Sequence, residues 1–173
     1  MAILNIPDHG RKISSPDEIR TFLSGIGVFF DQWKAEKILA PHATQEEVLS
    51  AYADSLNPYM KANGYKVADV INIQPDTENY PAIRAKFLSE HTHSEDEVRF
   101  FVEGQGHFWF HMDGQPVFNV LCEAGDLISV PAGVKHWFDA GEIRPRVKAI
   151  RIFIDTAGWV PNYTGSPIAG TYL

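Results

Sequence analysis

The sequence predicts a mainly β fold with helices in the N-terminal third, built as an antiparallel sandwich or barrel. From residue 66 onward, short strand-like runs rich in Val, Ile and Phe follow one another at roughly ten-residue intervals, with tight turns between them. Before residue 66, S-P-D-E at 15–18 and T-Q-E-E at 44–47 are patterns that begin helices. With 173 residues, 45% hydrophobic and 21% charged, the chain is long enough for one globular domain with a substantial core.

The first 65 residues are expected to be mostly helical and to pack on the β unit. After Ser15, apolar residues recur at the spacing of one helix face, which indicates an amphipathic helix. In order, we expect a strand at residues 2–6, a helix from Ser15 to Gly25, one or two helical turns at 34–39, and a helix from Thr44 to Leu56 that Asn57-Pro58 interrupts.

Residues 66–160 are expected to form the β unit, and residues 161–173 an extended tail. The segment 78–85 is ambiguous; we expect a helical turn there that leads into extended chain. A turn is also expected at 104–106, where two glycines separate strand-like runs. The main strands are expected at residues 66–73, 97–102, 107–112, 117–122, 127–131 and 147–154.

Composition and charge exclude several classes of function. A net charge of −7, with no cluster of Lys or Arg, argues against a nucleic-acid partner. No apolar run approaches membrane-spanning length, and the first residues do not have the pattern of a signal peptide. Cys122 is the only cysteine and is expected to be a buried apolar residue in a reducing compartment. We expect a cytoplasmic protein, and a monomer, because no helix presents an exposed apolar face.

The stretch E-H-T-H-S-E-D-E at 90–97 indicates a metal site. His91 and His93 are two residues apart, so on extended chain their side chains point to the same side. Glu97 follows at the start of a strand, and His136 is a fourth donor in P-A-G-V-K-H. Imidazole and carboxylate together suit iron, nickel, zinc or copper. Four such ligands on an octahedral ion leave two positions for a bidentate substrate.

Each of these histidines also has a purely structural interpretation. His91 and His93 could be surface residues on a polar loop, and His136 could belong to a turn. His107 and His111 share a strand face with Trp109 and are expected not to be ligands, because no carboxylate shares that face. The remaining histidines, His9 and His42, are expected to face solvent.

Arg99 is the candidate catalytic residue. It falls on the same strand face as Glu97, so it would point into the same cavity. A buried guanidinium needs an anionic partner, which is either Glu97 in a structural salt bridge or an anionic oxygen of a substrate.

Further residues are candidates for the surroundings of the site. Arg151 is a weaker candidate for the substrate pocket, since it could also form a structural pair. Phe87, Phe138 and Trp159 could wall an apolar pocket or could be plain core. Glu90 and Asp96 flank the ligands and could orient an imidazole.

Two motifs, in the right order and about 40 residues apart, give the chain a family resemblance. Residues 91–104 fit H-x-H-x3-E-x6-G and residues 125–136 fit G-x5-P-x-G-x2-H, which resemble the two metal-binding motifs of cupins, a family of antiparallel β-barrels of jelly-roll type. Ala85 and Ala140 depart from the usual pattern at positions that are not ligands. The runs E-H-T-H-S-E-D-E-V-R-F-F-V-E-G and D-L-I-S-V-P-A-G-V-K-H-W-F-D more narrowly resemble acireductone dioxygenases, and the likeness extends to the N-terminal third.

The resemblance implies a dioxygenase of the methionine salvage pathway that uses one Fe2+ or Ni2+ per chain. Its substrate would be an acireductone, 1,2-dihydroxy-3-keto-5-methylthiopentene, together with O2. In that family the iron form gives formate and 4-methylthio-2-oxobutanoate, and the nickel form gives 3-methylthiopropanoate, formate and carbon monoxide. The alternatives are another cupin metalloenzyme, either a dioxygenase or a sugar isomerase, and a non-catalytic cupin that binds a small ligand.

Overall fold

The computed structural model describes the backbone of residues 1–173 and every side chain except that of Trp159. The strands are β1 (Ile3–Ile6), β2 (Arg11–Ile13), β3 (Phe29–Gln32), β4 (Val67–Ile73), β5 (His91–Thr92), β6 (Glu97–His111), β7 (Phe118–Glu123), β8 (Asp126–Val130), β9 (Lys135–Asp139), β10 (Val147–Phe153) and β11 (Asn162–Tyr163). The helices are α1 (Pro16–Gly25), α2 (Gln45–Ala51), α3 (Ala53–Asn63) and α4 (Tyr80–Leu88), with 3-10 helices η1 (Pro7–His9), η2 (Thr156–Trp159) and η3 (Ile168–Thr171). No helix among the described residues is long and apolar enough to cross a membrane.

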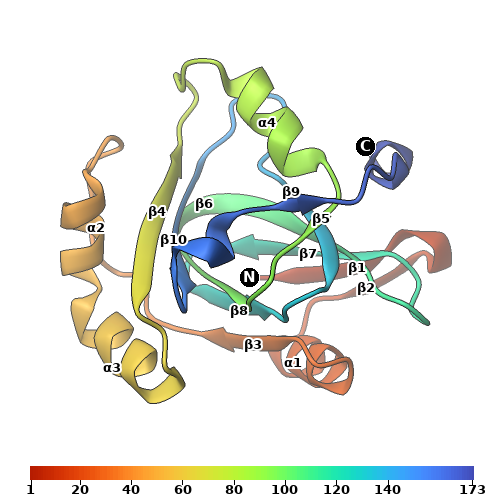
Figure 1. The fold of residues 1–173 in the computed structure, drawn as a ribbon, viewed down its shortest axis with the longest axis horizontal. Helices are drawn as coiled ribbons and strands as arrows, with labels where there is room; N and C mark the ends of the chain where they lie inside the picture. The colour runs from red at the N-terminus through yellow and green to blue at the C-terminus, as the bar shows by residue number, and fades with distance from the viewer.

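The strands form two antiparallel sheets that share one strand. The first sheet has the order β11-β5-β9-β6-β7-β1-β2, and the second has the order β3-β8-β6-β10-β4. Because β6 pairs with β8 and β10 in its first half and with β7 and β9 in its second, it bends from one sheet into the other (Figure 1). The predicted antiparallel jelly-roll architecture is confirmed, as a folded sheet that stays open rather than a closed barrel.

A β-bulge at Val102 changes which residues of β6 face the interior. Lys148 of β10 pairs with Glu103, whereas the next residue pairs with Phe101, so Val102 is an extra residue. Glu97 and Arg99 therefore face inward before the bulge, and the even-numbered Phe108 faces inward after it. The bulge brings side chains from both halves of one strand to the same cavity.

The predicted turn at residues 104–106 is wrong, because β6 continues through it. Both glycines are explained by the close approach of other atoms, backbone at Gly104 and an aromatic side chain at Gly106. Gly104 has φ +69°, and a Cβ there would lie 1.9 Å from the carbonyl oxygen of Arg146. At Gly106 a Cβ would lie 2.2 Å from Cζ of Phe138. These positions mark a sharp bend and tight packing rather than the end of a strand.

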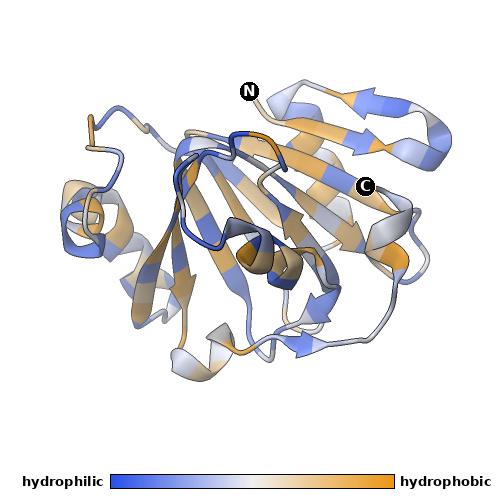
Figure 2. Cartoon of the chain, turned by 90° about the horizontal axis from the view of Figure 1, so that it is seen from above, coloured by the Kyte–Doolittle hydropathy of each residue, from blue (hydrophilic) through white to orange (hydrophobic). Residues whose placement is uncertain are grey.

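The helices cover the outer edges of the sheets. In Figure 1, α2 and α3 stand beside β4, and they pack Val48, Tyr52 and Leu56 on the outer face of the second sheet. A separate core lies between the two sheets and includes Phe108 and Phe138. Apolar residues recur along the strands, while the connecting loops are mostly hydrophilic (Figure 2). The core on the outer face of the second sheet, here called the outer core, thus anchors α2 and α3, whereas Ile19 and Leu23 of α1 belong to the core between the sheets.

Both predicted helix starts are confirmed. The Ser15 hydroxyl accepts a hydrogen bond from the backbone N–H of Glu18 at 3.4 Å. At Thr44 the capping box is complete, because its hydroxyl accepts from Glu47 N at 3.2 Å and its own N–H donates to the Glu47 carboxylate at 2.7 Å. These local hydrogen bonds depend only on residues three apart, which is why the sequence predicts them well.

Several other predicted elements need correction. Residues 34–39 are not helical; they have no regular secondary structure, and Ala35 and Leu39 pack on the outer core. Pro58 lies inside α3 instead of interrupting it. It cannot donate a hydrogen bond to the carbonyl oxygen four residues earlier, but Pro58 is exposed, so water can bond to that oxygen while Leu56 stays buried.

The ends of the predicted segments also differ from the structure. Helix α4 runs to Leu88, through residues that were expected to be extended. The first 65 residues contain strands β1, β2 and β3 as well as three helices. The expected tail at 161–173 contains β11 and η3, and Ala169 within it is buried. Each of these differences arises from pairing or packing with a distant segment.

Replacing Gly106 by alanine should destabilise the fold. The new methyl group would overlap the buried Phe138 ring, and overpacking of this kind costs about 1–3 kcal/mol. Urea denaturation would measure the change in free energy of unfolding. Gly25→Ala is the matched control, because nothing lies within 4 Å of a Cβ there, and it should be neutral or slightly stabilising. Equal effects at the two glycines would contradict the packing argument.

Candidate metal centre

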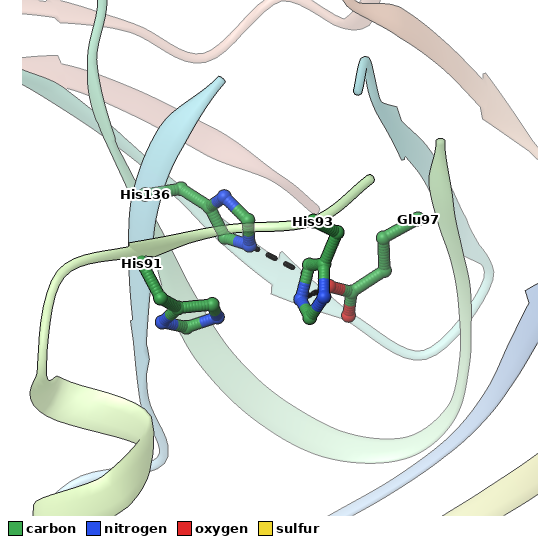
Figure 3. A group of neighbouring side chains, drawn as sticks. All are labelled: His91, His93, Glu97 and His136. Carbon is green, nitrogen blue, oxygen red and sulfur yellow. Dashed lines mark ion pairs between the residues drawn. The ribbon is translucent and has the colours of Figure 1, made fainter. Parts of the chain in front are cut away.

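Four side chains from different parts of the chain meet between the two sheets. They are His91 on β5, His93 just after it, Glu97 at the start of β6 and His136 on β9. One nitrogen or oxygen from each lies within 4.8 Å of the others, and all four residues are buried. Figure 3 shows the three imidazoles and the carboxylate pointing toward a common centre. The structure therefore brings together all four metal ligands that the sequence predicts.

Backbone pairing sets the positions of the histidines. Strands β5 and β9 are antiparallel neighbours, and His91 is paired directly with His136. The carbonyl oxygen of His93 accepts a hydrogen bond from Gly133 N at 2.9 Å, which fastens the first motif to the turn of the second. Asp96 adds a second link, because its Oδ1 accepts from Ala132 N at 2.9 Å. Asp96 thus joins the two motif loops and does not touch an imidazole.

Backbone carbonyls fix the tautomer of each imidazole. In all three rings Nδ1 lies within hydrogen-bond distance of a carbonyl oxygen, so Nδ1 carries the proton and Nε2 keeps its lone pair for the centre. The carbonyls belong to Ser89 at 2.7 Å from His91, Val134 at 2.8 Å from His136, and Val160 at 3.3 Å from His93.

The atoms at the centre fit a divalent cation. Nε2 of His93 lies 2.9 Å from a Glu97 oxygen, and Nε2 of His136 lies 3.5 Å from the same oxygen. His136 Nε2 is buried and has no hydrogen-bond partner among the described residues. Lone pairs that face a carboxylate at these distances repel one another unless a cation or proton lies between them. A metal ion bound by all four donors would satisfy every one of them.

The electrostatics keep the ligands in metal-binding form. Burial alone would raise the pKa of Glu97, but the positive charge of Arg99 holds this pKa well below its usual range. Burial, reinforced by the neighbouring His136, lowers the pKa of His91 to about 4. At neutral pH the group therefore contains an ionised carboxylate and a neutral His91.

Arg99 is held beside the four donors, and some of its N–H groups have no hydrogen-bond partner among the described residues. Its Nη2 donates to Glu97 Oε1 at 2.5 Å, on the opposite side of the carboxylate from the histidines. The guanidinium carbon lies 4.6 Å from the ring centres of both Phe108 and Phe138, which are 5.2 Å apart, so the two neighbouring rings pack against the group. Its Nε and Nη1 are buried and have no partner among the described residues.

A cavity of about 200 Å³ opens onto these groups. Of the predicted pocket residues, Phe87, Phe138 and Arg151 line it, and the side chain of Trp159 lies outside the part of the chain that the structure describes. Arg151 is also paired with Asp69, with Nε 2.8 Å from its Oδ1. The sequence analysis missed five further lining residues: Ile83, Lys86, Phe108, Pro161 and Tyr163.

Structural reasons explain why the sequence did not predict several of these lining residues. Phe108 lies beyond the Val102 bulge, which reverses the inward and outward alternation of β6. Lys86 and Ile83 belong to α4, whose length was underestimated. Arg84 ties this helix to β9 through Asp139 at 2.9 Å and so places it above the cavity. No local sequence pattern shows which helix will cover a cavity.

The other candidate residues lie outside the ligand group. Glu90 is buried, but its carboxylate contacts His111 and Thr164 rather than a ligand imidazole. His107 is not part of the four-residue group either. Burial raises the pKa of the Cys122 thiol well above its usual value, so this residue is an inert part of the core.

Comparison with known proteins places this arrangement in a family. Residues 9–161 match the model of the ARD/ARD' family. An acireductone dioxygenase from Picosynechococcus is 59% identical over 99% of this chain and 97% of its own length, and one from Granulibacter bethesdensis is 52% identical over 91% and 87%. The structure of an acireductone dioxygenase from Bacillus anthracis, with a cadmium ion in its active centre, is 35% identical with a TM-score of 0.84 and covers 94% of this chain and 98% of its own. The chain therefore belongs to the ARD/ARD' family.

Proposed function

We propose that this protein is a metal-dependent dioxygenase that cleaves the acireductone 1,2-dihydroxy-3-keto-5-methylthiopentene with O2. The observation that carries the proposal is the buried group of three imidazoles and one carboxylate beside Arg99, in a chain of the ARD/ARD' family. An enediol binds a divalent cation most tightly as its dianion, which also needs positive charge nearby. Both requirements are met by the residues of this cavity.

The ion we propose is Fe2+ or Ni2+, one per chain, held by His91, His93, Glu97 and His136. Neutral imidazoles with one carboxylate suit both of these borderline ions. When bound, the ion supplies Lewis acidity, which lowers the pKa of the enediol hydroxyls. The proposed products are formate and 4-methylthio-2-oxobutanoate for the iron form, and 3-methylthiopropanoate, formate and carbon monoxide for the nickel form.

Arg99 is proposed to bind an anionic oxygen of the substrate. Its Nε and Nη1 have no hydrogen-bond partner among the side chains and backbone that the structure describes, in a place from which water is largely excluded. An unpaired buried donor is costly, so a substrate oxygen that accepts from it is stabilised strongly. The rings of Phe108 and Phe138 keep the guanidinium in place, so little reorientation is needed when the substrate arrives.

The rest of the cavity suits the methylthio side chain. Phe87 packs edge-on against Phe138, with ring centres 6.0 Å apart, and Ile83 extends this apolar wall. Arg151, by contrast, is committed to Asp69, so we propose that it shapes the cavity and adds positive charge instead of chelating the substrate. The polar end of the substrate would thus face the ligands and the thioether would face α4.

Oxygen consumption and product analysis with a desthio-acireductone test the function directly. We expect turnover with both iron-loaded and nickel-loaded protein, and different products from the two forms. A sugar isomerase would convert its substrate without consuming O2, and a binding protein would retain the acireductone without turnover. The absence of metal-dependent oxygen consumption in both forms would refute the proposal.

Replacing His136 by alanine should remove the metal. This residue is one of the four proposed ligands, and loss of a group that merely supports a ligand already weakens metal binding by about 10–100-fold. We expect a loss of more than about 100-fold for the ligand itself, seen as metal per chain after dialysis. His107→Ala is the control, since His107 lies outside the group, and it should keep its metal. Retention of metal by the His136 variant would contradict the ligand assignment.

Replacing Arg99 by glutamine should separate turnover from metal binding. Removal of a positioned positive charge from the site should lower kcat/KM by about 10²–10³-fold, while metal remains bound because Arg99 is not a ligand. The measurements are metal content and steady-state kinetics on the metal-loaded protein. Arg20→Gln, on the exposed side of α1, is the matched control and should behave like the natural protein. Loss of metal together with unimpaired substrate binding would show that Arg99 serves only the metal.

A further inference from the structure

Residues 160–164, here called the strap, form part of the cavity wall. The strap contains β11, which pairs with β5 so that Tyr163 is opposite His91 and Asn162 is opposite Thr92. In Figure 1 this blue segment runs beside β5, away from the centre of the sheet. Four of its five residues are exposed, and two paired residues make a marginal strand. The strap therefore needs other contacts to keep its place.

The strap contributes directly to the site. Pro161 and Tyr163 line the cavity, and the Tyr163 ring lies edge-on to His91 with ring centres 5.9 Å apart. The carbonyl oxygen of Val160 accepts the hydrogen bond from His93 Nδ1. Movement of the strap would thus open the cavity wall and disturb the surroundings of two imidazoles.

A buried carboxylate holds the strap. The backbone N–H of Thr164 donates to the carbonyl of Glu90 at 3.1 Å, and its hydroxyl donates to Glu90 Oε1 at 2.6 Å. The other oxygen, Oε2, accepts from His111 Nδ1 at 2.6 Å, and His111 is the last residue of β6. Glu90 is only 2% exposed, so both of its oxygens need these partners. The carboxylate joins the strap to the rigid end of the central strand.

We propose that Glu90, Thr164 and His111 are positioning residues that hold the strap closed over the substrate. The inference rests on the proposed function, since it concerns the enclosure of the acireductone in the same cavity. None of the three is a metal ligand, and none lines the cavity except through the strap. We expect these residues to affect KM and not kcat. The cavity wall contacts the substrate equally in the ground state and in the transition state, and such contacts lower KM and leave kcat unchanged.

Thr164→Val is the variant that tests the network, because it removes the hydroxyl donor and keeps the shape of the side chain. The hydrogen bond to the charged Glu90 is then lost, together with the one that the hydroxyl accepts from Ser166 N at 3.2 Å, so we expect hydrogen exchange of the 160–166 segment to be about tenfold faster. With a desthio-acireductone, KM should rise about tenfold while kcat changes by less than about twofold. Metal content should stay at that of the natural protein.

Thr164→Ser restores the hydroxyl and should restore both exchange and KM. Thr21→Val makes the same chemical change on α1, where the hydroxyl donates only to the Asp17 carbonyl, and should alter neither. Unchanged exchange and KM in Thr164→Val, or a serine variant as impaired as the valine variant, would overturn the proposal. If the natural protein shows no turnover, only the proposed function fails, because hydrogen exchange still tests the network. Faster exchange in Thr164→Val that Thr164→Ser reverses would then support the network. Unchanged exchange in Thr164→Val would overturn it.

Discussion

A carboxylate with almost no access to water is the constraint on which the rest of this structure depends. Glu97 is 2% exposed, and a charge removed from water must be matched by other charges and by hydrogen-bond donors. Arg99 supplies them on one side, and the imidazoles of His93 and His136 lie on the other. The core between the sheets consists largely of apolar side chains, with Lys86 and Arg151 as further charged groups in the cavity wall, so the buried carboxylate favours a cation beside it.

The bend in β6 lets one strand serve both sides of this carboxylate. Before the bulge the strand carries Glu97 and Arg99, and after it Phe108 comes to the same cavity. Together with Phe138 of β9, Phe108 covers the guanidinium and reduces its contact with water. Interactions between charges are stronger in such surroundings, so the rings that exclude water also increase the effect of Arg99 on a bound anion.

The site also depends on backbone groups that carry no sequence signature. Each imidazole is oriented by a carbonyl oxygen. One of these carbonyls belongs to Val160, which lies 67 residues after His93 in the sequence. The strap is in turn held by Glu90, which was a candidate to orient one of the imidazoles of the four-residue group. Its carboxylate instead joins His111 at the end of β6 to Thr164 of the strap. The same segment therefore contacts an imidazole through Val160 and lines the cavity through Pro161 and Tyr163.

The sequence by itself determined the four donors, Arg99 as their neighbour and the antiparallel β architecture, because residue type, strand alternation and motif spacing act over a few positions. Only the tertiary structure decided that Phe108 faces the cavity, that Glu90 contacts Thr164, and that Pro161 and Tyr163 line the cavity. The physical reason is that hydrogen-bond register and side-chain partners between segments distant in sequence follow from how the sheets pack, and local patterns contain no information about that packing.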